Sequence, residues 1–137
     1  DDGSQKVITG NLWPPGDEDW YKITGTDDVT EDLEDNCDSF HFRASFAANP
    51  TGLMIDVYVD GCEGDKVECT DDTEYEHAYD DQFPGEFPTG QCPCSAEPTE
   101  GRTVCSAENK VFYIRVHGPV AACDNYQLVV SNAAEVP

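Results

Sequence analysis

Residues 16–24 read Gly-Asp-Glu-Asp-Trp-Tyr-Lys-Ile-Thr, an acidic turn that leads directly into an alternating segment. Tyr21 and Ile23 would share one face of a strand here, and Trp20 and Lys22 would share the opposite face. A period of two is typical of a half-buried β-strand. The stretch therefore predicts a strand that begins at the acidic turn and presents its Tyr-Ile face to a core.

The same alternation recurs along the chain and is clearest in residues 37–46, where three phenylalanines and an alanine alternate with polar residues. Turn-forming residues such as Asn49-Pro50-Thr51-Gly52 separate the alternating segments. Short strands without helical periodicity predict an all-β fold, an antiparallel β-sandwich of jelly-roll or Greek-key type. The predicted strands are residues 6–12, 19–24, 37–46, 53–60, 66–69, 111–117 and 126–130. The aromatic side chains expected between the sheets are Phe40, Phe42, Phe46, Phe112 and Tyr126.

The length of 137 residues fits a single domain, 1–137, that can bury its own core. An irregular insertion at about residues 70–102, rich in proline and aspartate, interrupts the periodic pattern. No run approaches the ~18 apolar residues of a membrane span. No charged and apolar leader opens the sequence, so we expect that any signal peptide has been removed.

The formal net charge of −22 is extreme for a chain of this size. Nucleic acid is disfavoured as a partner, because binding it depends on basic contacts. Bound divalent cations would relieve the self-repulsion of so acidic a chain. Acidic turns can gather the oxygen ligands that calcium prefers, and the alternative is an acidic surface that is merely solvated. The predicted calcium ligands are Asp17, Glu18, Asp19, Asp27 and Asp28, with a second acidic group at Asp71, Asp72, Asp80 and Asp81.

Seven cysteines in so short a chain indicate an oxidising compartment, and therefore a secreted or cell-surface protein. Their spacing lacks the paired Cys-x-x-Cys pattern of zinc sites, so we predict disulfides and one unpaired cysteine. Sequence alone leaves the connectivity open. The expected bridges are Cys62 to Cys69 across a turn and Cys37 to Cys123 at the sheet ends, with Cys94 and Cys105 tying down the insertion beside Cys92.

Aromatic residues outside the predicted core offer a surface that could stack on sugar rings or hold a protein partner. The alternative is that these side chains fold back over the sandwich. Trp20, Tyr58 and Tyr113 lie on strand faces opposite the predicted core, where they could also be covered by the insertion. The predicted ligand-binding residues are Trp13, Tyr75, Tyr79, Phe83 and Phe87.

Catalytic chemistry finds little support in the sequence. The histidines His41, His77 and His117 are scattered, and none accompanies a nucleophile motif such as Gly-x-Ser-x-Gly. Carboxylates are so abundant that any pair of them is uninformative about hydrolysis. We therefore expect no enzymatic activity.

Four segments, in order, resemble the bacterial pre-peptidase C-terminal domain family. Residues 16–23 resemble its opening Gly-Asp-x-Asp-Trp-Tyr-x-Phe signature, and residues 53–61 resemble its Leu-x-Leu-x-Leu-Tyr strand and turn. Residues 111–118 are similar to its Tyr-Tyr-Val-x-Val-x-Gly strand, and residues 125–130 to its closing Tyr-x-Leu-x-Val strand. The seven cysteines and the insertion depart from the family pattern.

The resemblance implies a jelly-roll-like sandwich of secreted bacterial proteins, often attached to extracellular proteases, without catalytic activity of its own. Some relatives bind collagen or polysaccharide, and some bind calcium near the N-terminal segment. We therefore predict a secreted accessory module that binds extracellular polysaccharide or protein, or stabilises an attached protease domain. A purely structural surface or lipoprotein domain is the alternative, and an extracellular hydrolase is a distant one.

Overall fold

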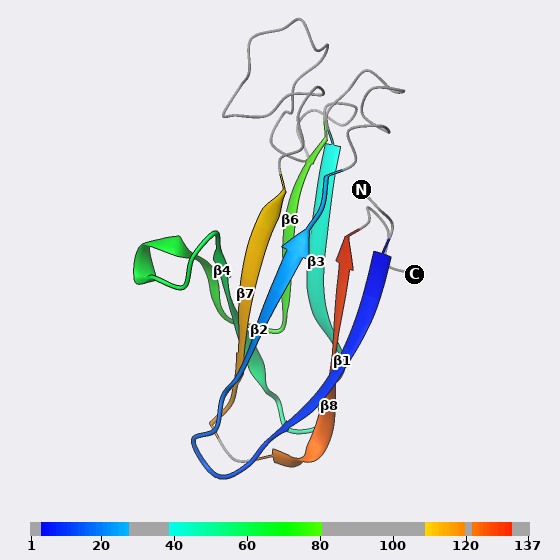
Figure 1. The fold of residues 1–137 in the computed structure, drawn as a ribbon. Coiled ribbons are helices and arrows are strands. Elements are labelled where there is room, and N and C mark those ends of the chain that lie inside the picture. The colour runs from blue at the N-terminus through cyan, green and yellow to red at the C-terminus, as the bar shows by residue number, and fades with distance from the viewer. Residues whose placement is uncertain (1–3, 28–38, 81–108, 120–121, 133–137) are drawn as a thin grey trace, which may run out of the picture.

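The computed structural model describes residues 4–27, 39–80, 109–119 and 122–132. Within these residues the chain forms an all-β antiparallel sandwich of two four-stranded sheets (Figure 1). The strand order is β1-β8-β3-β6 in one sheet and β2-β7-β4-β5 in the other, and a short 3-10 helix, η1, precedes β5. The elements are β1 (Ser4–Leu12), β2 (Asp19–Gly25), β3 (Ser39–Ala48), β4 (Met54–Val59), η1 (Gly64–Lys66), β5 (Val67–Asp72), β6 (Glu74–Asp80), β7 (Lys110–His117) and β8 (Ala122–Asn132).

The strands pair as they would in one long hairpin folded over on itself. β1 pairs with β8, β2 with β7, β3 with β6 and β4 with β5, and all these pairs are antiparallel. Further pairing of β3 with β8 and of β4 with β7 completes the two sheets. As a result, Ser4 at the start of β1 is the register partner of Asn132 at the end of β8.

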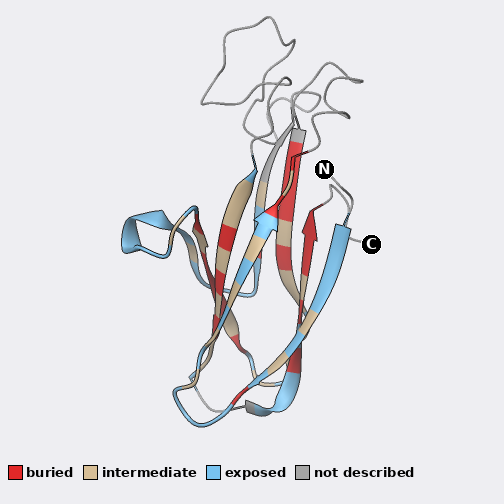
Figure 2. Cartoon of the chain, viewed as in Figure 1, coloured by how far each residue is buried: buried red, intermediate tan, exposed pale blue. Residues whose placement is uncertain are grey.

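The core lies between the sheets, and its residues come from the faces that the alternation predicts (Figure 2). Phe42 on β3 and Phe112 on β7 stack across the sandwich, with ring centroids 3.7 Å apart and planes 4° from parallel. Tyr21, Ile23 and Phe46 are partly buried and pack against this core. The buried apolar residues are Leu12, Phe40, Phe42, Ala44, Leu53, Ile55, Val57, Val59, Tyr75, Phe112, Ile114, Val116, Tyr126, Leu128 and Val130.

A polar link also joins the two sheets inside the sandwich. The hydroxyl of Tyr126 on β8 donates to Oδ2 of Asp19 on β2 at 2.6 Å, and it lies 2.6 Å from the hydroxyl of Tyr21. Burial and the hydrogen bond to Asp19 raise the pKa of Tyr126 far above its usual range. Gly10 lies against this hydroxyl, because a Cβ at that position would be 2.5 Å from it.

The predicted turns before β2 and β4 are confirmed. Between β1 and β2, the Trp13 amide donates to Oδ2 of Asp17 at 3.1 Å, and Gly16 adopts a φ of +87° that favours glycine. Before β4, the side chain of Asn49 binds both backbone groups of Leu53, at 2.6 and 2.8 Å.

The predicted extent of the irregular insertion, about residues 70–102, is wrong at its start. β5 continues to Asp72, and residues 74–80 form strand β6, which pairs with β3. Residues 81–108 lie outside the described part of the chain. Among the residues described, no helix has the length and apolar character needed to cross a membrane.

Candidate functional site

The outer face of the sheet β2-β7-β4-β5 gathers aromatic and charged side chains. The register places Trp20 of β2 beside Arg115 of β7, and Arg115 beside Asp56 of β4. The next row along the strands consists of Lys22, Tyr113 and Tyr58. These side chains alternate with the core residues of the same strands, so they point away from the core. We call this set of six residues the outer platform: Trp20, Lys22, Asp56, Tyr58, Tyr113 and Arg115.

The aromatic rings of the outer platform contact one another and two cations. The rings of Trp20 and Tyr58 lie 5.6 Å apart at an angle of 36°, so Trp20 reaches across β7. The guanidinium of Arg115 lies 5.9 Å from the Trp20 ring, and the Lys22 ammonium lies 5.7 Å from the Tyr113 ring. Trp20 nevertheless remains 46% exposed. The platform thus presents a large ring to solvent in a fixed place.

A buried carboxylate anchors the polar part of this face. Asp56 is only 2% exposed, and its Oδ2 accepts hydrogen bonds from Nε of Arg115 at 2.9 Å and from a second guanidinium nitrogen. Its Oδ1 accepts the Asp71 amide at 2.9 Å and lies 3.0 Å from Nε2 of His117. Burial alone would raise the pKa of Asp56, but these hydrogen bonds outweigh it and lower the pKa below its usual range. Glu18 adds a half-exposed partner for Arg115 at 3.3 Å.

Asp56, Asp71 and His117 form a group that could hold a metal ion. One ligand atom from each of the three lies within 4.8 Å of the others. Nε2 of His117 lies 3.6 Å from Oδ1 of Asp71. Of these residues, only Asp71 was a predicted metal ligand, in the second acidic group with Asp72, Asp80 and Asp81. The side chain of Asp80 and the whole of Asp81 lie outside the described part.

The predicted calcium ligands in the described residues are not gathered around one point. Asp17 caps the turn before β2, Glu18 pairs with Arg115 on the outer face, and Asp19 binds Tyr126 inside the sandwich. Asp27 follows the opposite end of β2, a strand of seven residues that is about 23 Å long. Asp28 lies outside the described residues. Calcium binding by this set stays a prediction.

The predicted ligand-binding aromatics fall into different environments. Trp13 is 58% exposed at the turn between β1 and β2, as that prediction requires. The prediction is wrong for Tyr75, a core residue only 8% exposed, whose hydroxyl donates to Glu68 at 3.0 Å. The side chain of Tyr79 and the residues Phe83 and Phe87 lie outside the described part.

The predicted disulfides are absent from the described residues, where Cys62, Cys69 and Cys123 carry free thiols. The bridge from Cys62 to Cys69 is wrong because Cys69 pairs with Val57 on β4, whereas Cys62 lies beyond the last pair of that ladder, Tyr58 with Val67. Cys69 packs against the core and Cys62 is exposed. Cys37, Cys92, Cys94 and Cys105 lie outside the described residues.

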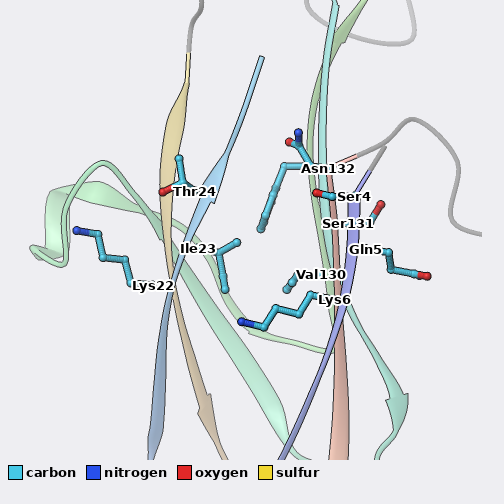
Figure 3. Close-up of a pocket in the computed structure, with 10 residues that line it drawn as sticks. Ser4, Gln5, Lys6, Lys22, Ile23, Thr24, Val130, Ser131 and Asn132 are labelled. Atoms are coloured by element: carbon cyan, nitrogen blue, oxygen red, sulfur yellow. The ribbon is translucent and has the colours of Figure 1, made fainter. Parts of the chain in front are cut away.

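An open hollow of about 370 Å³ separates β1 and β2, the edge strands of the two sheets. Figure 3 shows Lys6 reaching across it from β1, with Ile23 and Val130 beside it, while the end of the Lys22 side chain points away from it. The hollow follows from the topology, because β1 and β2 are not hydrogen-bonded to each other. We interpret it as the open edge of the sandwich.

No family model matches the chain, and no curated protein or solved structure matches it. The architecture alone identifies the chain as an all-β, two-sheet sandwich domain.

Sequence reasoning placed Trp20, Tyr58 and Tyr113 on the correct faces but did not recognise them as part of one site with Arg115 and Asp56. A signal was present in the sequence. Asp56 and Arg115 are charged residues within otherwise apolar or aromatic strands, and opposite charges in two such strands are candidates for a cross-strand pair. Their register, however, becomes visible only in the folded sheet.

Proposed function

We propose that this domain is a non-catalytic, secreted or cell-surface module that binds extracellular polysaccharide through the outer platform. The observation that carries the proposal is the exposed ring of Trp20, which is held beside Tyr58 on the face of a β-sheet. Sheet faces are well suited to this task, because neighbouring strands fix the spacing of the rings.

The chemistry of the platform suits a sugar. Pyranose rings have apolar faces that pack on aromatic side chains, and a few placed polar groups give orientation. Trp20 and Tyr58 supply the aromatic surface. Arg115 and Lys22 supply donors beside it, and the bond to buried Asp56 limits the movement of Arg115. A sugar bound on Trp20 would therefore meet donors that are already ordered.

The charge of the chain narrows the class of polysaccharide. A net charge of −22 repels polyanions, so uronate-rich or sulfated chains are unfavourable ligands. We propose a neutral glycan. Nucleic acid is disfavoured for the same reason.

The order of strand pairing supports a jelly-roll-type fold, as in the pre-peptidase C-terminal family. β1 to β4 pair in reverse order with β8 to β5, as in a long hairpin rolled into two sheets. We infer a related accessory role, in which the module directs an attached domain, such as a protease, to a polymer.

Pull-down on insoluble neutral glycans tests the proposal, with collagen as a parallel arm. The variant W20A should lose retention, and Y58A should weaken it. W13A is the matched control, because Trp13 is as exposed as Trp20 but lies on the turn rather than the platform. Equal melting temperatures would show that each variant is folded.

Each other outcome has a definite meaning. Retention that survives W20A but not W13A would move the site to the predicted turn. Retention on collagen alone would replace polysaccharide by protein as the partner. Retention on neither material would favour a purely structural domain. Repeating the assay with calcium and after chelation tests whether calcium, which the family resemblance implies, contributes.

A further inference from the structure

The three residues Asp56, Asp71 and His117 belong to three neighbouring strands, β4, β5 and β7, and meet beside the outer platform. We propose that they bind a divalent transition metal ion of the zinc class. The site shares Asp56 with the outer platform, but Asp71, His117 and the ligand are different, so the inference does not depend on the polysaccharide proposal.

The distances between the donor atoms fit a small metal ion. Zinc binds imidazole nitrogen and carboxylate oxygen at about 2.0–2.2 Å, so two donors in a tetrahedral site lie about 3.4 Å apart. Nε2 of His117 lies 3.0 Å from Oδ1 of Asp56 and 3.6 Å from Oδ1 of Asp71. Both separations are within about 0.4 Å of that value.

The donor set distinguishes this site from a calcium site. Calcium takes about 6–8 oxygen ligands, whereas an imidazole nitrogen is a ligand suited to zinc and its neighbouring transition metals. Three protein ligands leave a fourth position open for water or another small ligand. Asp71 is 71% exposed, so that position would be reached from solvent.

The surrounding hydrogen bonds already orient the buried ligand. Arg115 occupies Oδ2 of Asp56, and the Asp71 amide donates to Oδ1. Metal binding would therefore replace the contacts that Nε2 of His117 makes with the two aspartates, and the hydrogen bonds from Arg115 and from the Asp71 amide would remain. Such partners of a ligating carboxylate fix its direction and strengthen metal binding.

The local charge also favours a dication. The carboxylates of Asp56, Asp71 and Glu18 outnumber the guanidinium of Arg115 by two charges, with His117 neutral as a ligand. A divalent ion would neutralise the group. Because Asp56 is buried, this charge is less screened than that of the acidic residues on the surface.

Titration of the chelator-treated, reduced protein with zinc tests the proposal. Binding is followed by calorimetry and by the NMR resonances of the imidazole nitrogens. We expect zinc to shift the ring resonance of His117 and to leave those of His41 and His77 in place. D71N should weaken the zinc binding that shifts this resonance about tenfold or more, and H117Q should weaken zinc binding in calorimetry by a similar factor. D72N is the matched control, because it removes the same charge from the adjacent residue and should change affinity less than twofold.

Three results would overturn the proposal. An unmoved His117 resonance would mean that zinc binds elsewhere, for example at the free thiols. Equal weakening by D71N and D72N would indicate general attraction to an acidic chain. A shift of the same resonance by calcium at matched ionic strength would contradict the preference for a transition metal. Because Asp71 is exposed, D71N should fold, and circular dichroism would verify this.

Discussion

Arg115 and Asp56 are register partners on β7 and β4, and the guanidinium binds one oxygen of the carboxylate through two nitrogens. The two residues are 59 positions apart in sequence. Their contact holds Arg115 under the Trp20 ring and fixes one ligand of the proposed metal site. The same ion pair therefore supports both functional proposals.

Replacing Asp56 by asparagine should lower the free energy of unfolding at pH 7 by about 1–3 kcal/mol, because buried donors lose a charged acceptor. Since folding lowers the pKa of Asp56, its stabilising effect is present above the pKa of the unfolded chain, about 3.9, and is lost as the pH falls through the lower folded pKa. Denaturant unfolding from pH 7 to pH 2 measures this. The difference between the wild type and D56N should narrow in acid.

D124N provides the matched control for this series, because Asp124 is exposed on β8 and loses the same charge. We expect D124N to change the unfolding free energy by less than about 0.5 kcal/mol at every pH. If D56N and D124N behave alike, the ion pair contributes no stability.

The stacked pair Phe42 and Phe112 should be among the most sensitive positions of the core. Both side chains are fully buried, so F112A removes apolar contacts and leaves a cavity, at a cost of about 3–5 kcal/mol. The exposed Val67 serves as a control, and V67A should cost less than about 0.5 kcal/mol. Chemical denaturation of the three proteins measures both values, and a small loss for F112A would contradict the assigned core.

Gly10 and Tyr126 should be energetically coupled. G10A places a methyl group 2.5 Å from the Tyr126 hydroxyl, and we expect it to destabilise the fold by about 1–3 kcal/mol. Y126F removes that hydroxyl and should relieve part of the cost, which a double-mutant cycle measures. G64A is the control, since a methyl group there would meet nothing within 4 Å. Strict additivity of G10A and Y126F would contradict the contact.

The cysteines Cys62 and Cys69 should differ in reactivity. Burial, with the charges of Asp72 and Asp56, raises the pKa of the Cys69 thiol, whereas Cys62 is exposed. Under native conditions at pH 8, iodoacetamide should modify Cys62 about tenfold faster or more, because the thiolate is the reactive form. Peptide mass mapping over time measures the two rates. A disulfide-linked peptide containing both residues would instead restore the bridge that the sequence predicted.

The fold could be predicted where local alternation was strong. In β7, Phe112, Ile114 and Val116 alternate with Tyr113 and Arg115, and that pattern determines both the strand and its buried face. β6 was missed because its buried Tyr75 stands between glutamates and precedes a proline-rich segment. The alternation of Tyr75 and His77 with Glu74 and Glu76 was nevertheless a usable signal.

The site was harder to predict, because it depends on register rather than on periodicity. The alternation in the sequence places Asp56 and Arg115 on strand faces opposite the core, but it does not show that the two side chains meet. The same limit explains the Cys62–Cys69 error, since two irregularities in the β4–β5 ladder shift the partners. The acidic residues 17–19 suggested a shared cation site for another reason, because adjacency in sequence does not imply a common direction. Their three carboxylates point in different directions and bind three different groups.

The pairing of Ser4 with Asn132 has a mechanical consequence. Tension applied at these two positions would pull β1 and β8 apart from one end, so their hydrogen bonds would break one after another. Sheets loaded in this way yield at lower force than sheets whose strands must slide past each other, because each step loads few bonds. If the domain is tethered through both ends, we expect β1 to peel away first and uncover the hydrogen-bonding edge of β8 with which it pairs.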